Sequence, residues 1–278
     1  MPRYRLLAID IDGTLVNSQN ELTDATREAV LRAKRADIKI VLATGRRYSR
    51  ALPLVEPLAL CVPLVTASGA LIKRAADHLT LYQAQFAAGA LEACLEIVSR
   101  AGYEAVLYAD TFHQGFDFYF PGAGSGEPLI AEFLERNRGF ERVVPELMTR
   151  PPAGIFAGFA MGTRDDMLRL SDELTRQLGE RLYVHVLRSP RYAGYMCEIA
   201  PFGVSKWSGV SRLATEWGIG PEEICAAGDD VNDIPMIEAA ALGVAMGNAL
   251  DEVKAVADRI APSHDDDGLV QVVDWILE

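Results

Sequence analysis

The sequence has few cysteines and no long apolar segment. Only four cysteines occur in the 278 residues, Cys61, Cys94, Cys197 and Cys225, and they lack the paired spacing of a metal site. No apolar run approaches the length of a membrane span, and the N-terminus lacks the charged and then apolar arrangement of a signal peptide. We therefore expect reduced, mostly buried thiols in a cytoplasmic protein without a membrane partner.

Basic residues are scarce relative to acidic ones. Lys and Arg number 27 and Asp and Glu 39, which gives a formal net charge of −12. A nucleic-acid partner normally requires a basic face, so this balance argues against one. It does not exclude a small anionic substrate, because local cations and a bound metal can override the overall field. Half of the residues are hydrophobic, enough for the core of one large domain or two moderate ones.

Short apolar runs alternate with helical patterns at both ends of the chain. Strands are predicted over residues 6–9 and 38–43, with a helix over 25–36 between them that Thr23 can cap. Further strands are predicted over 62–66, 196–200, 224–227 and 243–246, and further helices over 206–216, 232–240, 251–257 and 268–277. This alternation predicts an α/β fold with a doubly wound, mostly parallel, Rossmann-like sheet.

The middle of the chain has a different character. After a predicted helix over 90–100, it contains an aromatic stretch over 112–120, which we expect to pack in a core. Predicted strands over 155–161 and 182–187 flank a helix near 165–178. We therefore predict an α+β module over 84–192, inserted between the two parts of the sheet domain, 1–83 and 193–278.

Two carboxylates follow the first predicted strand. Asp10 and Asp12 stand at alternate positions, and Gly13 permits the sharp turn that ends the strand. Ligands of open α/β sheets bind at the carboxyl ends of the strands, so both side chains are expected in one crevice. Two carboxylates so close repel each other unless a cation or a proton lies between them. A hard divalent ion, most simply Mg²⁺, would relieve that repulsion.

These residues have the chemistry needed for phosphoryl transfer to a carboxylate. Asp10 could attack phosphorus and form an aspartyl phosphate, which divides a difficult hydrolysis into two steps. Asp12 could protonate the leaving oxygen and then deprotonate the water that cleaves the intermediate. Lys206 could place a positive charge beside Asp10 and the developing negative charge.

Two further polar groups complete this hypothesis. After the second predicted strand, the hydroxyl of Thr44 and the neighbouring N–H groups, at Gly45 and Arg46, can hold phosphate oxygens. After the strand over 224–227, Asp229 can bind a metal together with Asp10 and the main-chain oxygen of Asp12. The carboxylates of Asp230 and Asp233 could orient these ligands.

Four segments, in this order, resemble the haloacid dehalogenase-like hydrolases of the Cof-type sugar-phosphatase branch. They are Asp10-Ile11-Asp12-Gly13-Thr14, Ala43-Thr44-Gly45-Arg46, Gly203-Val204-Ser205-Lys206 and Gly228-Asp229-Asp230-Val231-Asn232-Asp233. The resemblance implies a Mg²⁺-dependent phosphatase with Asp10 as nucleophile and Asp12 as general acid and base. It also implies that Asn232 and Lys206 contact phosphate or substrate, and that the module over 84–192 is a large cap.

Three features leave alternatives open. Where Cof-type members usually have Asn-Gly-Ala, this chain has Ser68-Gly69-Ala70, so the substrate contact of that loop stays open, although the shorter Ser68 can still form a hydrogen bond. Residues 264–267 resemble the family's acidic turn with altered residues, and either a solvated loop before the last helix or a role near the metal fits them. Arg46 could contact substrate or pair with the surplus carboxylates.

The combined expectation is a phosphatase acting on a small phosphorylated metabolite, by family analogy a sugar phosphate. A phosphomutase could use the same aspartyl phosphate and return the group to another hydroxyl. A non-catalytic phospho-acceptor module also clusters Asp residues around Mg²⁺, although such modules are far shorter and have no insertion. The substrate and the oligomeric state stay open.

Overall fold

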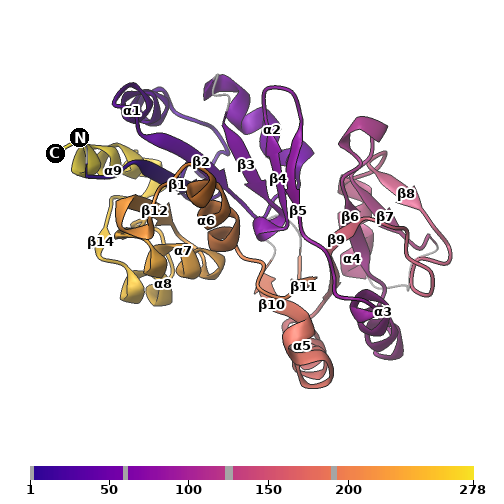
Figure 1. Ribbon diagram of the computed structural model, residues 1–278. Coiled ribbons are helices and arrows are strands. Elements are labelled where there is room, and N and C mark those ends of the chain that lie inside the picture. Colours follow the sequence, from indigo (N-terminus) through magenta and orange to yellow (C-terminus); the bar gives the residue numbers. More distant parts are fainter. Residues whose placement is uncertain (1–2, 59–61, 123–127, 189–192) are drawn as a thin grey trace. The chain divides into compact units, whose positions relative to one another are not determined.

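The computed structural model describes residues 3–58, 62–122, 128–188 and 193–278. The chain divides into two compact units, shown in Figure 1. The first, which we call the sheet domain, comprises Met1–Tyr82 and Ser205–Glu278, and the second, the inserted domain, comprises Gln83–Val204. None of the described helices is both long enough and apolar enough to span a membrane.

The sheet domain contains an eight-stranded sheet of order β14-β13-β12-β1-β2-β3-β4-β5. Its strands are β1 (Leu6–Asp10), β2 (Lys39–Ala43), β3 (Pro63–Thr66), β4 (Leu71–Arg74), β5 (Thr80–Gln83), β12 (Ile224–Gly228), β13 (Leu242–Ala245) and β14 (Arg259–Ile260). Its helices are α1 (Asp24–Arg35), α2 (Tyr48–Val55), α6 (Lys206–Glu216), α7 (Ile234–Ala239), α8 (Asp251–Val256) and α9 (Gly268–Leu277). The strands from β14 to β3 are parallel, and β4 is antiparallel to β3.

β1 is a central strand of this sheet, between β12 and β2, and all five of its residues are buried. Leu6 and Ala8 face α6 and α7 in one apolar cluster, and strand alternation directs Leu7 and Ile9 to the other face. On that other side, α1 and α9 pack together, and Arg32 of α1 pairs with Asp274 of α9 at 2.8 Å (Figure 1). Helices on both faces explain why the strands have continuous apolar runs and lack alternation.

The connections leave β1 and β12 in opposite directions across the sheet. From β1 the chain proceeds to β2 and β3 on one side, and from β12 to β13 and β14 on the other. β1 and β12 are neighbours in register, with Leu6 opposite Ile224 and Ile9 opposite Ala227. The crevice beyond their carboxyl ends is the topological switch point, where open α/β sheets bind ligands.

The inserted domain is a six-stranded sheet of order β10-β11-β9-β6-β7-β8. Its strands are β6 (Val106–Ala109), β7 (Phe118–Phe120), β8 (Glu141–Val143), β9 (Ile155–Gly162), β10 (Leu182–Arg188) and β11 (Tyr195–Pro201), and its helices are α3 (Ala90–Arg100), α4 (Pro128–Arg136) and α5 (Arg164–Leu178). Helices α3 and α5 cover one face in one apolar cluster, and α4 packs against the other. Phe118 and Phe120 are buried under α4, which confirms the expected core role of the aromatic stretch.

The placement of residues 196–200 in the parallel sheet is wrong. They form a strand, β11, but it pairs antiparallel with β9 and β10 in the inserted domain. The boundary therefore lies near residue 204, and not at 192 as predicted. Three cysteines are buried free thiols, Cys94, Cys197 and Cys225, whereas Cys61 lies outside the described residues.

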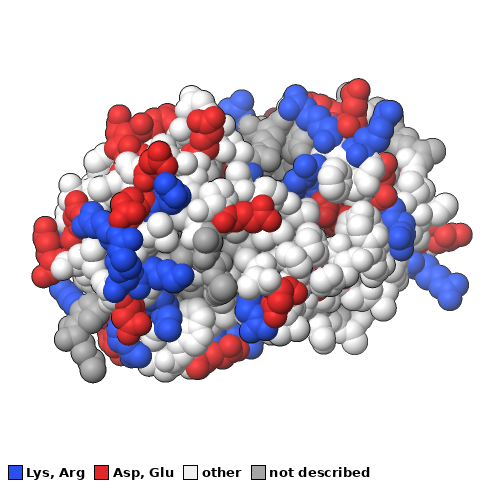
Figure 2. Space-filling view, turned by 90° about the horizontal axis from the view of Figure 1, so that it is seen from above, with Lys and Arg blue, Asp and Glu red and all other residues white. Residues whose placement is uncertain are grey.

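Basic and acidic side chains are interspersed over the described residues on the face shown in Figure 2. Many basic groups pair with a neighbouring carboxylate, such as Arg27 with Asp24 and Arg169 with Asp166. Pairs of this kind at the surface contribute little to stability, about 0–1 kcal/mol each. The buried ion pairs of the sheet domain are therefore the more informative ones.

Candidate active site

A lysine bonded to two carboxylates lies at the carboxyl end of β1. Lys206 Nζ donates to Asp10 Oδ1 at 2.6 Å and to Asp233 Oδ1 at 2.7 Å. All three side chains are buried, with no more than 3% of any exposed. Burying charges is costly unless they pair and form hydrogen bonds, and this arrangement satisfies both conditions.

The start of α6 places Lys206 there. The Ser205 hydroxyl caps the helix by accepting from the N–H of Ser208, whose own hydroxyl accepts from the N–H of Ser205. A cation in the first helical turn opposes the helix dipole, so the position of Lys206 is explained by its two carboxylates and not by helix stability. Gly69 makes the approach possible, since a Cβ there would lie 2.0 Å from the Ser205 carbonyl oxygen.

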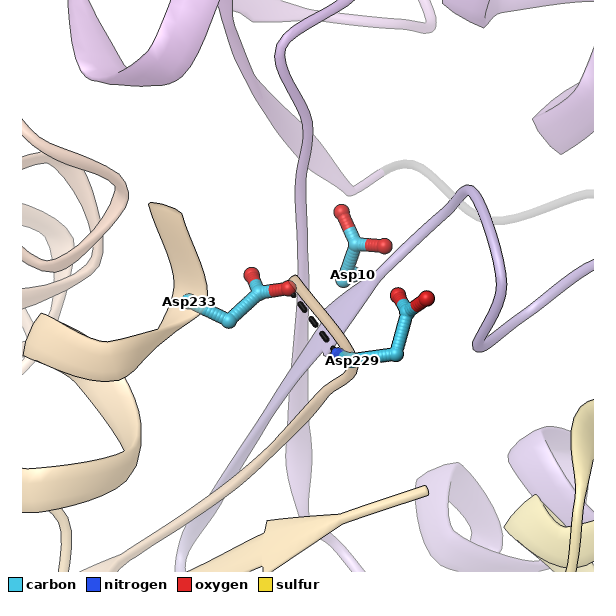
Figure 3. A group of neighbouring side chains, drawn as sticks. All are labelled: Asp10, Asp229 and Asp233. Atoms are coloured by element: carbon cyan, nitrogen blue, oxygen red, sulfur yellow. Dashed lines mark hydrogen bonds between the residues drawn. The ribbon is translucent and has the colours of Figure 1, made fainter. Parts of the chain in front are cut away.

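Three carboxylates form a group that could hold a metal. Asp10, Asp229 and Asp233 each offer an oxygen, and these atoms lie within 4.8 Å of one another. Figure 3 shows the side chains of Asp10 and Asp229 close together, with Asp233 bonded to the main chain of Asp229. One lysine cannot balance three carboxylates, so this set of oxygens fits a hard divalent cation such as Mg²⁺.

Asp233 organises the turn after β12. Its Oδ2 accepts from the N–H groups of Asp229 and Asp230, each at 3.1 Å, while its Oδ1 accepts from Lys206. Both oxygens of Asp233 are therefore engaged, and Asp10 and Asp229 are the better candidates for direct metal ligands. A Cβ at Gly228 would lie 2.4 Å from the Asp233 carboxyl carbon, so only glycine permits this approach.

The surroundings shift the acidity of these groups. Burial, and then the nearby Asp233 carboxylate, raises the pKa of Asp10 well above its usual range, although Lys206 lowers it. Burial and Asp233 likewise raise the pKa of Asp229 to about 7. Burial lowers the pKa of Lys206, but the carboxylates of Asp10 and Asp233 raise it by more, so the lysine stays charged. These pKa shifts follow from the surplus of negative charge among groups that are buried away from water.

Asp12 does not join this group. Its carboxylate pairs with both Nε and Nη2 of Arg46, with Arg46 Nε at 2.6 Å from Asp12 Oδ2. Arg46 Nη2 also donates to Asn20. The Arg46 side chain is 9% exposed and that of Asp12 40% exposed. Of the two alternatives for Arg46, the structure therefore shows the ion pair with a surplus carboxylate.

The loops after β2, β3 and β12 converge beside these acids. Thr44 is buried, its Oγ1 accepts from the N–H of Arg46 at 3.0 Å, and its carbonyl accepts from the N–H of Ser68 at 3.0 Å. A Cβ at Gly45 would lie 3.5 Å from Ser68 Oγ and 3.6 Å from Asn232 Nδ2. Within the described residues, Asn232 Oδ1 is a buried acceptor without a hydrogen-bond donor. An atom of this kind is costly unless a ligand group completes it.

The predicted site residues thus fall into two arrangements. Asp10, Lys206, Asp229 and Asp233 form one group, and Thr44, Gly45 and Asn232 lie in adjoining loops. Asp230 Oδ1 accepts from the N–H of Val231 and caps the short helix η6 (Val231–Asp233), and the Asp230 carboxylate adds to the charge that raises the pKa of Asp229. Ser68 adopts a left-handed backbone conformation with φ 53°, which asparagine tolerates more readily.

Sequence reasoning missed Thr14, Asn20 and Asn248. Thr14 Oγ1 lies 3.4 Å from Asp229 Oδ1, Asn20 accepts from Arg46, and Asn248 Nδ2 lies 3.3 Å from Asp229 Oδ2. Thr14 could have been found, because it stands in the first motif segment. Nothing local marks Asn20 or Asn248, since their partners lie 26 and 19 residues away.

The fold and the site together define a class of protein, a doubly wound α/β protein with a buried acidic site at the topological switch point of its sheet. The sequence profile of the haloacid dehalogenase-like hydrolases matches residues 7–273. The chain therefore belongs to the haloacid dehalogenase-like hydrolase family, as the four segments predicted.

Known relatives resemble the chain over nearly its whole length. Phosphatase YwpJ of Bacillus subtilis is 28% identical over 296 residues, covering 98% of this chain and 100% of YwpJ. The 5-amino-6-(5-phospho-D-ribitylamino)uracil phosphatase YcsE of the same organism is 27% identical over 280 residues, an alignment that covers 98% of this chain and 96% of YcsE. The crystal structure of a haloacid dehalogenase-like hydrolase from Bacteroides thetaiotaomicron matches with a TM-score of 0.79 at 26% identity, covering 98% of this chain and 99% of that one.

Proposed function

We propose that this protein is a Mg²⁺-dependent phosphatase that hydrolyses phosphomonoesters of small metabolites through an aspartyl phosphate on Asp10. The observation that carries the proposal is the position of the Asp10 carboxylate, bonded to Lys206 and within reach of Asp229 at the end of β1. The phosphatase relatives YwpJ and YcsE support the same reaction class. By the same analogy we propose a sugar phosphate or similar metabolite as substrate. The buried free thiols of Cys94, Cys197 and Cys225 favour the cytoplasmic location that we also propose.

In the first step, Asp10 attacks phosphorus and displaces the alcohol. Lys206 neutralises negative charge that develops on the phosphoryl group, and the Thr44 hydroxyl and the N–H group of Gly45 bind its oxygens, while the N–H of Arg46 donates to Thr44 Oγ1 and orients the hydroxyl. Asp10 and Asp229 would hold Mg²⁺, with the main-chain oxygen of Asp12 as a further ligand. When bound, the ion offsets the surplus carboxylate charge and polarises the phosphoryl group.

We assign proton transfer to Asp12. It gives a proton to the leaving oxygen in the first step and removes one from the attacking water in the second. The ion pair with Arg46 stabilises the ionised form of Asp12, which suits the second step. The first step requires protonated Asp12, so the ion pair between Arg46 and Asp12 must open before that step. The Arg46 guanidinium then becomes available to a substrate anion.

The experiment is phosphate release from a panel of phosphorylated metabolites, with and without Mg²⁺, by native protein and Asp10→Asn. We expect activity that requires the metal and falls by at least about 10⁴-fold in the variant, because the nucleophile is gone. Exposed Asp24→Asn is the matched control and should keep native activity. Substantial activity in folded Asp10→Asn would exclude the proposed nucleophile. An isomeric phosphate with little free phosphate would identify a phosphomutase instead.

Mg²⁺ binding should weaken as the pH falls. The pKa of Asp229 is raised to about 7 in the metal-free site, so below that pH the ion must displace a proton. The dissociation constant for Mg²⁺ should rise with falling pH below about 7, by up to about tenfold per pH unit, and level off above it. Titration calorimetry at a series of pH values measures this, and an affinity unchanged between about pH 5.5 and 7.5 would contradict it.

The same shift has a consequence for the metal-free fold. Because the folded pKa of Asp229 lies above the unfolded one, its contribution to stability is full below about pH 4 and is lost as the pH rises through about 7. Added Mg²⁺ should therefore raise the melting temperature more at about pH 8 than at about pH 5. The comparison needs only thermal unfolding in buffers with and without the ion.

A further inference from the structure

We propose that Asn248 is a positioning residue for the metal ligand Asp229, and that through Asn248 the segment Ser263–Asp267, the closing loop, controls the affinity for the ion. This inference rests on the metal site of the proposed function. The closing loop acts on the metal site indirectly, through the hydrogen bonds of Asn248 and not through its own carboxylates.

The amide of Asn248 bridges three parts of the chain. Its Nδ2 donates to the Gly13 carbonyl at 2.9 Å and to Asp229 Oδ2 at 3.3 Å, and its Oδ1 accepts from the N–H of His264 at 2.9 Å. The His264 N–H can only donate, which fixes the orientation of the amide and directs its NH₂ group to Gly13 and Asp229. Asn248 thus joins the turn after β1, the turn after β12 and the closing loop.

Asn248 is not a buried polar residue that needs protein partners for its hydrogen bonds. The Asn248 side chain belongs to an exposed residue, so water could satisfy it. Protein atoms nevertheless take both N–H donors of the amide and one lone pair of its oxygen, and one of these partners is a carboxylate proposed to bind the ion. Partners of metal ligands that fix ligand orientation are typically worth about 10–100-fold in metal affinity.

Close backbone packing holds Asn248 in place. The preceding Gly247 donates its N–H to the Pro262 carbonyl at 3.2 Å, and a Cβ at Gly247 would lie 2.7 Å from the Ser263 nitrogen. On the other side, the N–H of Met246 donates to the Gly228 carbonyl at 3.0 Å. Asn248 therefore follows β13 at a point where the chain is fixed between the end of β12 and the closing loop.

The closing loop is itself bound to the segment that follows β1. His264 Nδ1 lies 2.8 Å from the Val16 carbonyl oxygen, and Asp265 accepts from the N–H of Ser18 at 2.8 Å and from its hydroxyl at 2.6 Å. Asp267 accepts from the hydroxyls of Thr23 and Thr26. The carboxylates of Asp265 and Asp267 are occupied in these bonds, and Asn248 is the side chain that links this loop to Asp229 in the part of the chain that the structure describes.

The turn at Gly13 shows why this connection matters. Gly13 has φ +74°, and a Cβ there would lie 2.2 Å from Asp229 Oδ2, so the turn and this carboxylate are packed together. The Asn248 amide donates to both, and it thereby fixes the spacing between them. Without it, the Asp229 carboxylate loses its bond at Oδ2 and keeps the 3.4 Å bond from Thr14 Oγ1. The carboxylate is then less fixed at the metal position, and binding of the ion must supply the free energy of ordering it.

The test compares Mg²⁺ binding by native protein, Asn248→Ala and Asn248→Leu, measured by calorimetry and by the rise in melting temperature that Mg²⁺ causes. Leucine keeps the size of the amide and removes all three hydrogen bonds. We expect both variants to bind Mg²⁺ about 10–100-fold more weakly. Asp266→Ala, in the same loop, is the control. The Asp266 side chain is exposed and makes no hydrogen bond among the described residues. This variant should bind Mg²⁺ like native protein.

The two readouts separate positioning from general destabilisation. A purely structural role would lower the melting temperature equally with and without Mg²⁺ and leave the Mg²⁺-induced rise unchanged. Positioning reduces that rise while the metal-free melting temperature changes little. Native affinity in both variants would overturn the inference alone, whereas native protein that binds no Mg²⁺ would overturn the proposed metal site and the inference together.

Discussion

Lys206→Met is expected to lower phosphate release by at least about 10²–10³-fold, the usual effect of removing a charge aimed at the transition state. The same change leaves Asp10 and Asp233 buried without the cation that both of them bond. Breaking a buried pair in this way typically costs about 3–5 kcal/mol of folding stability. We therefore expect lower stability in metal-free Lys206→Met, with partial recovery on addition of Mg²⁺, because the ion supplies positive charge at the same carboxylates.

Steady-state kinetics and denaturant unfolding, each with and without Mg²⁺, measure the two effects. Lys39→Met removes the same charge at an exposed position at the start of β2 and should leave both quantities near native values. Lys206→Arg tests geometry, since a planar guanidinium cannot place one nitrogen between the two carboxylates as Nζ does. Native turnover by folded Lys206→Met would contradict the role assigned to this lysine.

Asp12→Ala should separate substrates by their leaving group. An alkyl phosphate needs a proton on its leaving oxygen, so its hydrolysis should fall by about 10²–10⁴-fold. p-Nitrophenyl phosphate has a leaving group that departs without one, so the variant should release about one equivalent of nitrophenol per site and then slow, because no base activates the water. Rapid-mixing measurements of nitrophenol release show the burst directly.

Asp12→Asn is the matched variant, as it keeps the shape of the side chain and one acceptor for Arg46 but cannot exchange protons. It should behave as Asp12→Ala does toward both substrates. Equal losses for the alkyl and nitrophenyl substrates, with no burst, would show that Asp12 serves the fold or the metal and not proton transfer.

The elements of the sheet domain were predictable because their signals are local. The buried run before Asp10 and the helix that begins at Lys206 are both continuous in sequence, and both occur where expected. Residues 196–200 show the limit of such signals. Their strand pattern is real, but it depends on burial on both faces, which either sheet can provide, so it does not specify the sheet to which β11 belongs.

The proximity of predicted residues within motif segments was also accessible from the sequence, and that of residues outside these segments was not. The proximity of Lys206 to Asp10 joins positions 196 residues apart, and the resemblance of their motif segments predicted it, because the strand that precedes Lys206 belongs to the inserted domain and not to the parallel sheet. Which partner a polar side chain chooses depends on rotamer and distance. The pairing of Arg46 with Asp12, and the bridge made by Asn248, therefore became visible only in three dimensions.

The central claim is that Asp10 carries the phosphoryl group, and mass spectrometry of Asp12→Ala tests it most directly. The variant would be mixed with p-nitrophenyl phosphate and Mg²⁺, quenched in acid, digested and mapped. The proposed mechanism predicts that the mass of one phosphoryl group is added to the peptide containing Asp10, and that the double variant Asp10→Asn/Asp12→Ala lacks it. Continued turnover by Asp12→Ala with an unmodified peptide, or a phosphoryl group on another residue, would contradict the mechanism.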